Sequence, residues 1–293
     1  KKTYKLTAFK MLELFFKWLW FKMKWLIRVI YGTHEITRIC NANSDQSNIP
    51  QEDFFQSFKH SKVLTNFRDP KTKVLHKKYD NEKVLANEII KRKGLKHLTK
   101  RGNFNLIVYS GKMIRINQCI EVIKKEASTP YQESNPNHEA MLLELWENMM
   151  PGIKRTNGRY CMDWCKIGFQ GKNPATDFRG MGILSLKNML YLSKFPDLAK
   201  RILEESNHEQ FHYGFAIAAI NLTGDLYQYV VRHQLDYKFI LPKYENASAL
   251  HIFHILFMKT MNRFSRYWIK HKHHVMEFNQ VRKEFFREFE LEI

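Results

Sequence analysis

Apolar residues recur every three or four positions through most of the second half of the chain, which is the period of an amphipathic α-helix. The segment Glu139–Met150 has this pattern and ends at Pro151 and Gly152, a pair that stops helices. No alternation of strands and helices is visible, so the pattern predicts an all-α, multi-helix fold and disfavours Rossmann and barrel architectures. Five further helices are predicted, over Ile183–Phe195, Pro196–Glu205, Tyr213–Arg232, Ala247–Lys270 and Val275–Glu290.

The segment from Phe9 to Tyr31 predicts an N-terminal amphipathic helix, with five charges on one narrow stripe, apolar residues opposite and Lys22 as the exception. So many charges make a membrane-spanning helix costly, whereas Trp and Lys together suit a helix lying in the headgroup layer of an anionic membrane. We therefore expect residues 9–31 to contact an anionic membrane surface. The alternative is a helix that packs its apolar face on the rest of the protein. The charges on the stripe are Lys10, Glu13, Lys17, Lys24 and Arg28.

Between this helix and the second half, residues 41–61 are polar and contain a proline, which predicts a loop or linker. Residues 62–125 alternate basic clusters with apolar positions at helical spacing, which predicts solvated basic helices. A break follows at Ser128–Asn137. We therefore divide the chain into a membrane-seeking helix over 1–31, a basic helical region over 32–128 and a third domain over 129–293.

The net charge of +19 is unevenly distributed. Residues 1–31 hold 8 basic and 1 acidic residues and residues 59–125 hold 18 and 5, whereas residues 126–293 hold 21 and 19. Basic tracts can bind the phosphates of nucleic acid or of lipid, but no nucleic-acid module is recognised, so no nucleic-acid partner is expected and membrane phosphates are the simpler interpretation. Four scattered cysteines do not form a disulfide framework, which favours a reducing, cytosolic compartment.

One stretch, WCKIGFQGKNPATDFRGMG over residues 164–182, has no helical period and is punctuated by glycines. It predicts a rigid loop that displays Arg179, anchored to the core by Trp164, Phe169 and Phe178. Asp177 is placed to cap the next helix through free backbone N–H groups. Two roles stay open for Arg179 on these grounds, a local ion pair with Asp177 or the surface, and a contact with a partner.

This stretch resembles the signature of the ELMO domain. The similarity continues in HEAMLLELWENMMP, ILSLKNMLYLS, YGFAIAAINLT and MEFNQVRKEF, and in HEITRIC after the aromatic N-terminal helix. The resemblance implies an ELMO domain over 129–293 and activation of Arf-family and Arf-like small GTPases in the GTP-bound state. It also implies that Arg179 is the catalytic arginine, because the family's arginine falls on the DFR triplet.

An inserted arginine needs no metal or cofactor of its own, since Mg²⁺ and nucleotide belong to the GTPase. We expect a cytoplasmic protein that is peripheral on intracellular membranes. The alternative is a catalytically silent adaptor, the role of relatives that lack the arginine. The family usually has an acid where this chain has Asn173, which leaves its effect on activity open. The residues expected to position the loop are Trp164, Gly168, Phe169, Gln170, Pro174, Asp177, Phe178 and Gly180.

Three other patterns in the sequence resemble metal or phosphate sites. The run from His208 to His212 matches the H-E-x-x-H zinc pattern, but no third ligand stands in a familiar place. Cys161 and Cys165 lie four residues apart with no nearby histidine, so buried thiols are expected rather than a metal site. The histidines at 271, 273 and 274 predict a solvated turn between the last two helices. No Walker-type loop is present, so the chain should not bind GTP alone.

Overall fold

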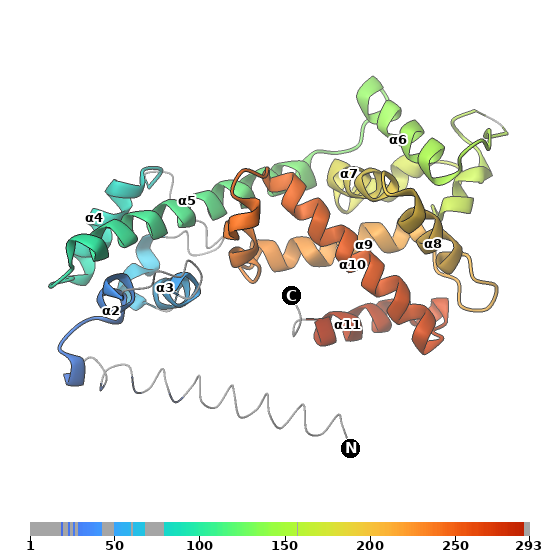
Figure 1. Cartoon of the computed structure of the whole chain (residues 1–293). Coiled ribbons are helices and arrows are strands. Elements are labelled where there is room, and N and C mark those ends of the chain that lie inside the picture. The colour runs from blue at the N-terminus through green and yellow to red at the C-terminus, as the bar shows by residue number, and fades with distance from the viewer. Residues whose placement is uncertain are drawn as a thin grey trace, which may run out of the picture. The chain divides into compact units, whose positions relative to one another are not determined.

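The computed structural model describes residues 29–42, 50–59, 61–67, 79–156 and 158–289, with isolated positions at Leu19, Met23 and Leu26. Within this described part every regular element is an α- or 3₁₀-helix, which confirms the all-α prediction (Figure 1). Most of the expected membrane-seeking helix over 9–31 lies outside the described residues. Among the helices that are described, none has both the length and the apolar character needed to span a bilayer.

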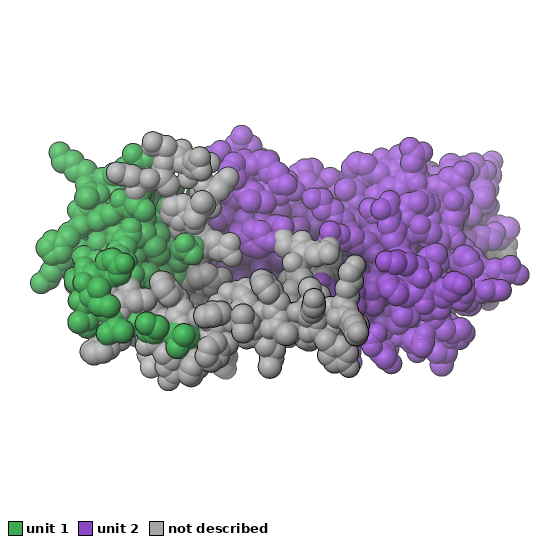
Figure 2. Space-filling model, turned by 60° about the horizontal axis from the view of Figure 1, so that its bottom comes forward, with its two compact units in different colours: residues 1–114 green, residues 115–293 purple. Residues whose placement is uncertain are grey.

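The chain divides into two compact units, residues 1–114 and residues 115–293, which Figure 2 colours separately. The prediction of a loop over 41–61 was wrong in part, because residues 50–59 form a helix. Phe54 and Phe58, one helical turn apart, are buried, and the ring of Phe54 lies 4.9 Å from that of Tyr109. This aromatic burial outweighs the polar composition, and a proline at the first helical position costs no hydrogen bond. The first unit contains α2 (Glu35–Asn41), α3 (Pro50–Lys59), η1 (Lys62–Phe67), α4 (Glu82–Lys93) and the first half of α5 (Lys100–Ser128).

The second unit is built around α7 (Gly182–Ser193), which packs against four other helices and is buried along most of its length. Those neighbours are α6 (Pro136–Met149), α8 (Pro196–Ser206), α9 (Phe215–Val231) and α10 (Ala249–His271). The predicted helices are confirmed to within a few residues, except that the last one is two elements, η6 (Val275–Glu277) and α11 (Phe278–Phe289). His274 caps η6 with a capping box, so the chain starts a tight 3₁₀ turn before α11 begins.

The connection from α9 to α10 contains η4 (Asp236–Ile240) and η5 (Pro242–Tyr244). Arg115, on the second half of α5, holds this connection by donating hydrogen bonds to four of its carbonyl oxygens. The guanidinium reaches the carbonyl of Tyr244 at 2.7 Å and that of Ala247 at 3.2 Å. One arginine therefore satisfies backbone acceptors that no helix pairs.

Candidate functional site

The sequence signature folds as two short 3₁₀-helices, η2 (Met162–Ile167) and η3 (Pro174–Arg179), joined by a turn. Gly168 ends η2 with a φ of 81°, a left-handed conformation that favours glycine. A Cβ atom at Gly168 would lie 2.2 Å from the amide nitrogen of Phe215, and the Gly168 carbonyl accepts a hydrogen bond from Ile217. Glycine is therefore needed for the turn to lie directly against the start of α9.

The other end of the signature is fixed in the same way. Gly182 has a φ of 49°, and a Cβ atom there would lie 2.2 Å from the carbonyl oxygen of Thr129. That same oxygen accepts a hydrogen bond of 2.9 Å from the amide of Ile183. The segment between the two glycines is thus anchored at both ends by close backbone contacts.

Three aromatic rings anchor the underside of this segment in the core. Trp164, Phe169 and Phe178 are buried, and their rings meet edge to face at 5.9 Å and 5.6 Å between successive centroids. The ring of Tyr131 stacks on Phe178 at 5.0 Å, and the Trp164 indole donates to the carbonyl of Arg159. Each buried ring contributes about 1.5–3 kcal/mol by leaving water, so the segment is held independently of any partner.

A polar network holds η3 from one side, and Asn173 is its centre. The side-chain oxygen Oδ1 of Asn173 accepts a hydrogen bond from the backbone N–H of Ala175, and Asn173 thereby caps η3. The same oxygen accepts from Nη1 of Arg159 at 2.9 Å. Its amide group donates to Glu133 at 2.8 Å. Arg159 in turn donates through Nε to both carboxylate oxygens of Glu139 at 2.9 Å. Sequence reasoning missed Arg159, Glu133 and Glu139, because nothing in their spacing marks them as neighbours of Asn173.

Asp177 has a different role from the one predicted. It lies within η3, its carboxylate accepts a hydrogen bond of 3.0 Å from the amide of Gln170, and α7 begins without a side-chain cap. Burial raises the pKa of Asp177, against the opposing effects of the Gln170 N–H and of the Arg179 charge. The capping prediction was wrong because Asp177 is part of η3, which continues to Arg179 before α7 begins at Gly182. The contact instead closes the turn that carries Gly171 and Pro174.

Arg179 is the last residue of η3 and its side chain is exposed. Within the part of the chain that the structure describes, the guanidinium of Arg179 forms no hydrogen bond and no ion pair. The ion pair with Asp177, which the sequence left open, is not formed; the Asp177 carboxylate accepts from the amide of Gln170 instead. A Cβ atom at the next residue, Gly180, would meet nothing within 4 Å. The segment therefore presents, beside open space, a guanidinium that acts on Asp177 through its charge but forms no hydrogen bond or ion pair with the described residues.

The zinc-like pattern lies elsewhere and does not form a helix. His208 and His212 lie in the turn between α8 and α9, where Nδ1 of His208 accepts from the amides of Gln210 and Phe211. Cys161 is buried and Cys165 is partly buried. Among the described residues no group of three or more His, Cys, Asp or Glu side chains is placed to hold a metal ion.

The helical fold and the glycine-anchored signature define a class of protein. A family model described as ELMO/CED-12 matches residues 121–282, more than half of the chain, and the chain belongs to this family. ELMO domain-containing protein 2 of Mus musculus is 32% identical over 273 residues, covering 90% of this chain and 88% of that protein. ELMO domain-containing protein 1 of Mus musculus is 30% identical, covering 92% and 86%. ELMO domain-containing protein B of Dictyostelium discoideum is 31% identical, covering 91% and 92%. No solved structure matches.

Proposed function

We propose that this chain activates GTP hydrolysis on Arf-family and Arf-like small GTPases by inserting Arg179 next to the γ-phosphate. The observation that carries the proposal is the exposed guanidinium of Arg179, unpaired among the described residues, on a segment whose other parts are firmly anchored. An ordinary surface arginine has no such support beneath it. Membership of the ELMO/CED-12 family and the resemblance of the DFR triplet to the family's arginine motif support the same role.

The chemistry requires a positive charge where negative charge develops. During GTP hydrolysis charge spreads over the γ-phosphoryl oxygens, and an arginine inserted in trans accelerates the reaction by roughly 10³- to 10⁵-fold. A guanidinium is planar and delocalised and presents a fork of donors, which the point charge of a lysine does not reproduce. Anchoring at Gly168 and Gly182 fixes the loop in advance, so less conformational entropy is lost on docking.

The substitution Arg179→Lys tests the proposal directly. We expect it to lower the stimulated rate by roughly 10³-fold or more, because the donor fork is lost while a positive charge remains. The measurement is single-turnover phosphate release from a panel of GTP-loaded Arf and Arf-like proteins. The midpoint of urea unfolding should not change, since the side chain forms no hydrogen bond or ion pair with the described residues.

Arg232→Lys is a matched control, because Arg232 is also an exposed arginine but lies at the C-terminal end of α9. This control should retain the wild-type rate. Stimulation by Arg179→Lys at the wild-type rate would overturn the proposal. If the wild-type chain binds the GTP-loaded partners without accelerating hydrolysis, the adaptor alternative is correct instead.

A further inference from the structure

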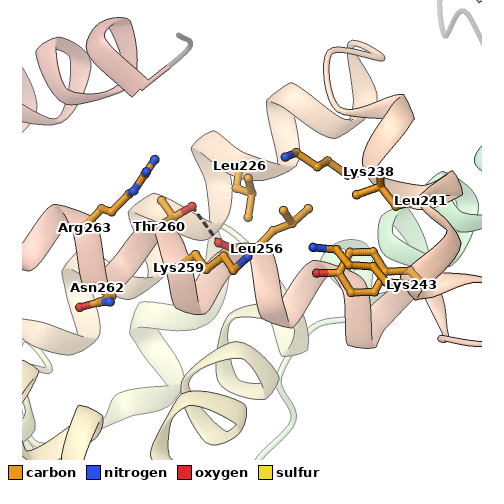
Figure 3. Close-up of a pocket in the computed structure, with 10 residues that line it drawn as sticks. Leu226, Lys238, Leu241, Lys243, Leu256, Lys259, Thr260, Asn262 and Arg263 are labelled. Atoms are coloured by element: carbon orange, nitrogen blue, oxygen red, sulfur yellow. Dashed lines mark hydrogen bonds between the residues drawn. The ribbon is translucent and has the colours of Figure 1, made fainter. Parts of the chain in front are cut away.

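A basic cavity of about 350 Å³ lies between α10 and the connection that precedes it. Figure 3 shows Lys238 and Lys243 entering from that connection and Lys259 and Arg263 from α10, around the side chains of Leu226 and Leu256. None of the described residues that line the cavity is acidic. Its volume falls at the lower end of the range of small-molecule sites, which is about 300–1,000 Å³.

The described residues offer two lysines of this cavity an aromatic ring: Nζ of Lys238 lies 4.7 Å from the ring centroid of Tyr237, and Nζ of Lys243 lies 5.0 Å from that of Tyr244. No carboxylate in the described part of the chain forms an ion pair with Lys238, Lys243 or Lys259. The nearby Asp236 is engaged by Nδ1 of His233 at 3.1 Å. Burial and the charge of Lys243 lower the pKa of Lys238, so a bound anion would favour the protonated side chain. Bringing like charges together costs free energy that a bound anion would return.

The helix beside the cavity extends the positive surface. Lys259, Arg263, Arg266 and Lys270 follow one another at intervals of three or four residues along α10 and are all exposed, so they lie along one side of the helix. The 23-residue helix contains no Asp or Glu. A polyanion seated in the cavity would therefore meet further cations along this side of α10.

Backbone contacts keep the cavity open without a ligand. Arg115 fixes the connection that carries Lys243 through the carbonyls of Tyr244 and Ala247. The hydroxyl of Thr260, at the wall of the cavity, donates a hydrogen bond of 2.8 Å to the backbone carbonyl of Leu256 (Figure 3). The polar groups left to bind a ligand are thus mainly cationic, which selects against neutral molecules.

We propose that this cavity binds a multiply phosphorylated anion, of the kind carried by inositol phosphate headgroups. Phosphate groups match several convergent lysines, whose ammonium groups bind phosphate as point charges. The Leu241 and Leu256 side chains, which line the cavity and keep some exposed surface, offer an apolar wall to the ring that carries the phosphates. The site is separate from the loop of Arg179, and it stands whether or not the chain activates a GTPase.

The test combines Lys238→Gln, Lys243→Gln and Lys259→Gln in the full chain. Calorimetry with soluble inositol trisphosphate should show binding by the wild type and an affinity loss on the order of 100-fold in the triple variant, since each lysine near an anionic phosphate surface contributes about fivefold. The matched control is Lys154→Gln, Lys200→Gln and Lys283→Gln, which removes the same charge from exposed sites of the same unit and should bind as the wild type.

Vesicles distinguish a lipid headgroup from a free phosphate ligand. Vesicles that contain phosphatidylinositol bisphosphate are compared with phosphatidylserine vesicles of equal surface charge. If the triple variant loses the preference for the phosphoinositide as well, the ligand is a lipid headgroup; if it loses only soluble binding, the ligand is free. Equal affinity of the triple variant and the wild type for inositol trisphosphate overturns the proposal, as does an equal loss in the control.

Folding and activity are checked separately. Lys259→Glu alone changes only an exposed side chain and should lower inositol trisphosphate affinity by roughly 10-fold or more, which keeps the test valid if the triple variant unfolds. Unchanged binding by Lys259→Glu would count against the site. Stimulation of a soluble GTPase by the triple variant should equal that of the wild type, so failure of the Arg179 proposal leaves this result interpretable.

Discussion

At the scale of single residues, the glycines of the signature divide into two that the backbone requires, Gly168 and Gly182, and two that have open space around the Cβ position, Gly171 and Gly180. Gly168→Ala should destabilise the protein by about 3 kcal/mol or more, because its left-handed φ is strained for alanine and the Cβ atom meets the backbone of α9. Gly180→Ala should be neutral or slightly stabilising, since φ is −76° and nothing lies within 4 Å. Urea unfolding of both variants measures the difference, and equal midpoints would refute the backbone argument.

Asn173 stands where the family usually has an acidic residue, and the structure shows what its side chain contacts. Its side chain is turned inward, where it caps η3 and connects Arg159 to Glu133. An aspartate could accept from the same two donors but could not donate to Glu133. Asn173 therefore helps to hold η3, the segment that carries Arg179, in place.

The substitution Asn173→Asp should raise the pKa of Glu133. Hydrogen bonds from Tyr160 and Asn173 hold that pKa below its usual value, and the variant replaces one of these donors with a negative charge. Carboxyl carbon chemical shifts in an NMR titration report the change. Asn173→Gln, which keeps the amide, serves as the neutral comparison. A Glu133 pKa that stays at the wild-type value in Asn173→Asp would show that the hydrogen bond is not formed in solution.

At the scale of elements, a network of hydrogen-bonded polar side chains connects three helices of the second unit. On α7, the side-chain nitrogen Nδ2 of Asn188 donates to the hydroxyl of Thr223 on α9 at 2.9 Å. The side-chain oxygen Oδ1 of Asn188 lies 2.6 Å from Nδ1 of His254 on α10. Because the Asn188 oxygen can only accept, Nδ1 of His254 carries the proton. The His254 ring also stacks on Tyr191 at 5.3 Å.

The neutral histidine in this hydrogen-bonded network should make the fold sensitive to acid. Burial, with the charges of Lys187, His251 and Lys194, lowers the pKa of His254 from 6.5 to about 4. Between these two values the unfolded chain binds a proton that the folded chain excludes, so the free energy of unfolding decreases as the pH falls, by about 2–3 kcal/mol. Urea unfolding at several pH values measures the slope. His254→Gln should flatten it over this window, and parallel profiles for the two proteins would contradict the assignment.

The helices of the second unit could be predicted from sequence because their apolar period is regular and Pro or Gly marks their ends. The 3₁₀-helices η2 and η3 could not, since six residues make only two turns of a 3₁₀-helix, which is too short to show a repeating pattern. The anchors Trp164 and Phe178 stand out as aromatics in a glycine-rich stretch. Arg159 does not, because its partners come from segments that only the folded chain brings together.

At the scale of the whole molecule, the basic excess lies before the part that the family model matches. Residues 1–31 hold 8 basic residues against 1 acidic residue, whereas residues 126–293 are nearly balanced. We therefore propose that the N-terminal half supplies most of the attraction to anionic membranes and that the proposed GTPase activation belongs to the second unit. A GTPase activator that shares a membrane with its substrate gains local concentration without any new contact to the substrate.

Removal of residues 1–31 tests this division. A chain of residues 32–293 should lose vesicle binding by at least roughly 100-fold, since each basic residue near an anionic surface contributes about 1 kcal/mol. Its stimulation of a GTPase in solution should be unchanged, whereas stimulation of the same GTPase on vesicles should fall.

The full-length variant Lys10→Gln, Lys17→Gln and Lys24→Gln distinguishes the two interpretations of the helix, because it removes charge without removing apolar surface. If the helix lies on lipid, this variant should bind phosphatidylserine vesicles more weakly than the wild type, and removal of residues 1–31 should leave the urea midpoint unchanged. If the helix instead packs on the protein, deletion should lower that midpoint, because the apolar face it covers becomes exposed. Such a decrease, with vesicle binding retained, would contradict the membrane assignment and place the membrane contact in the remaining basic region.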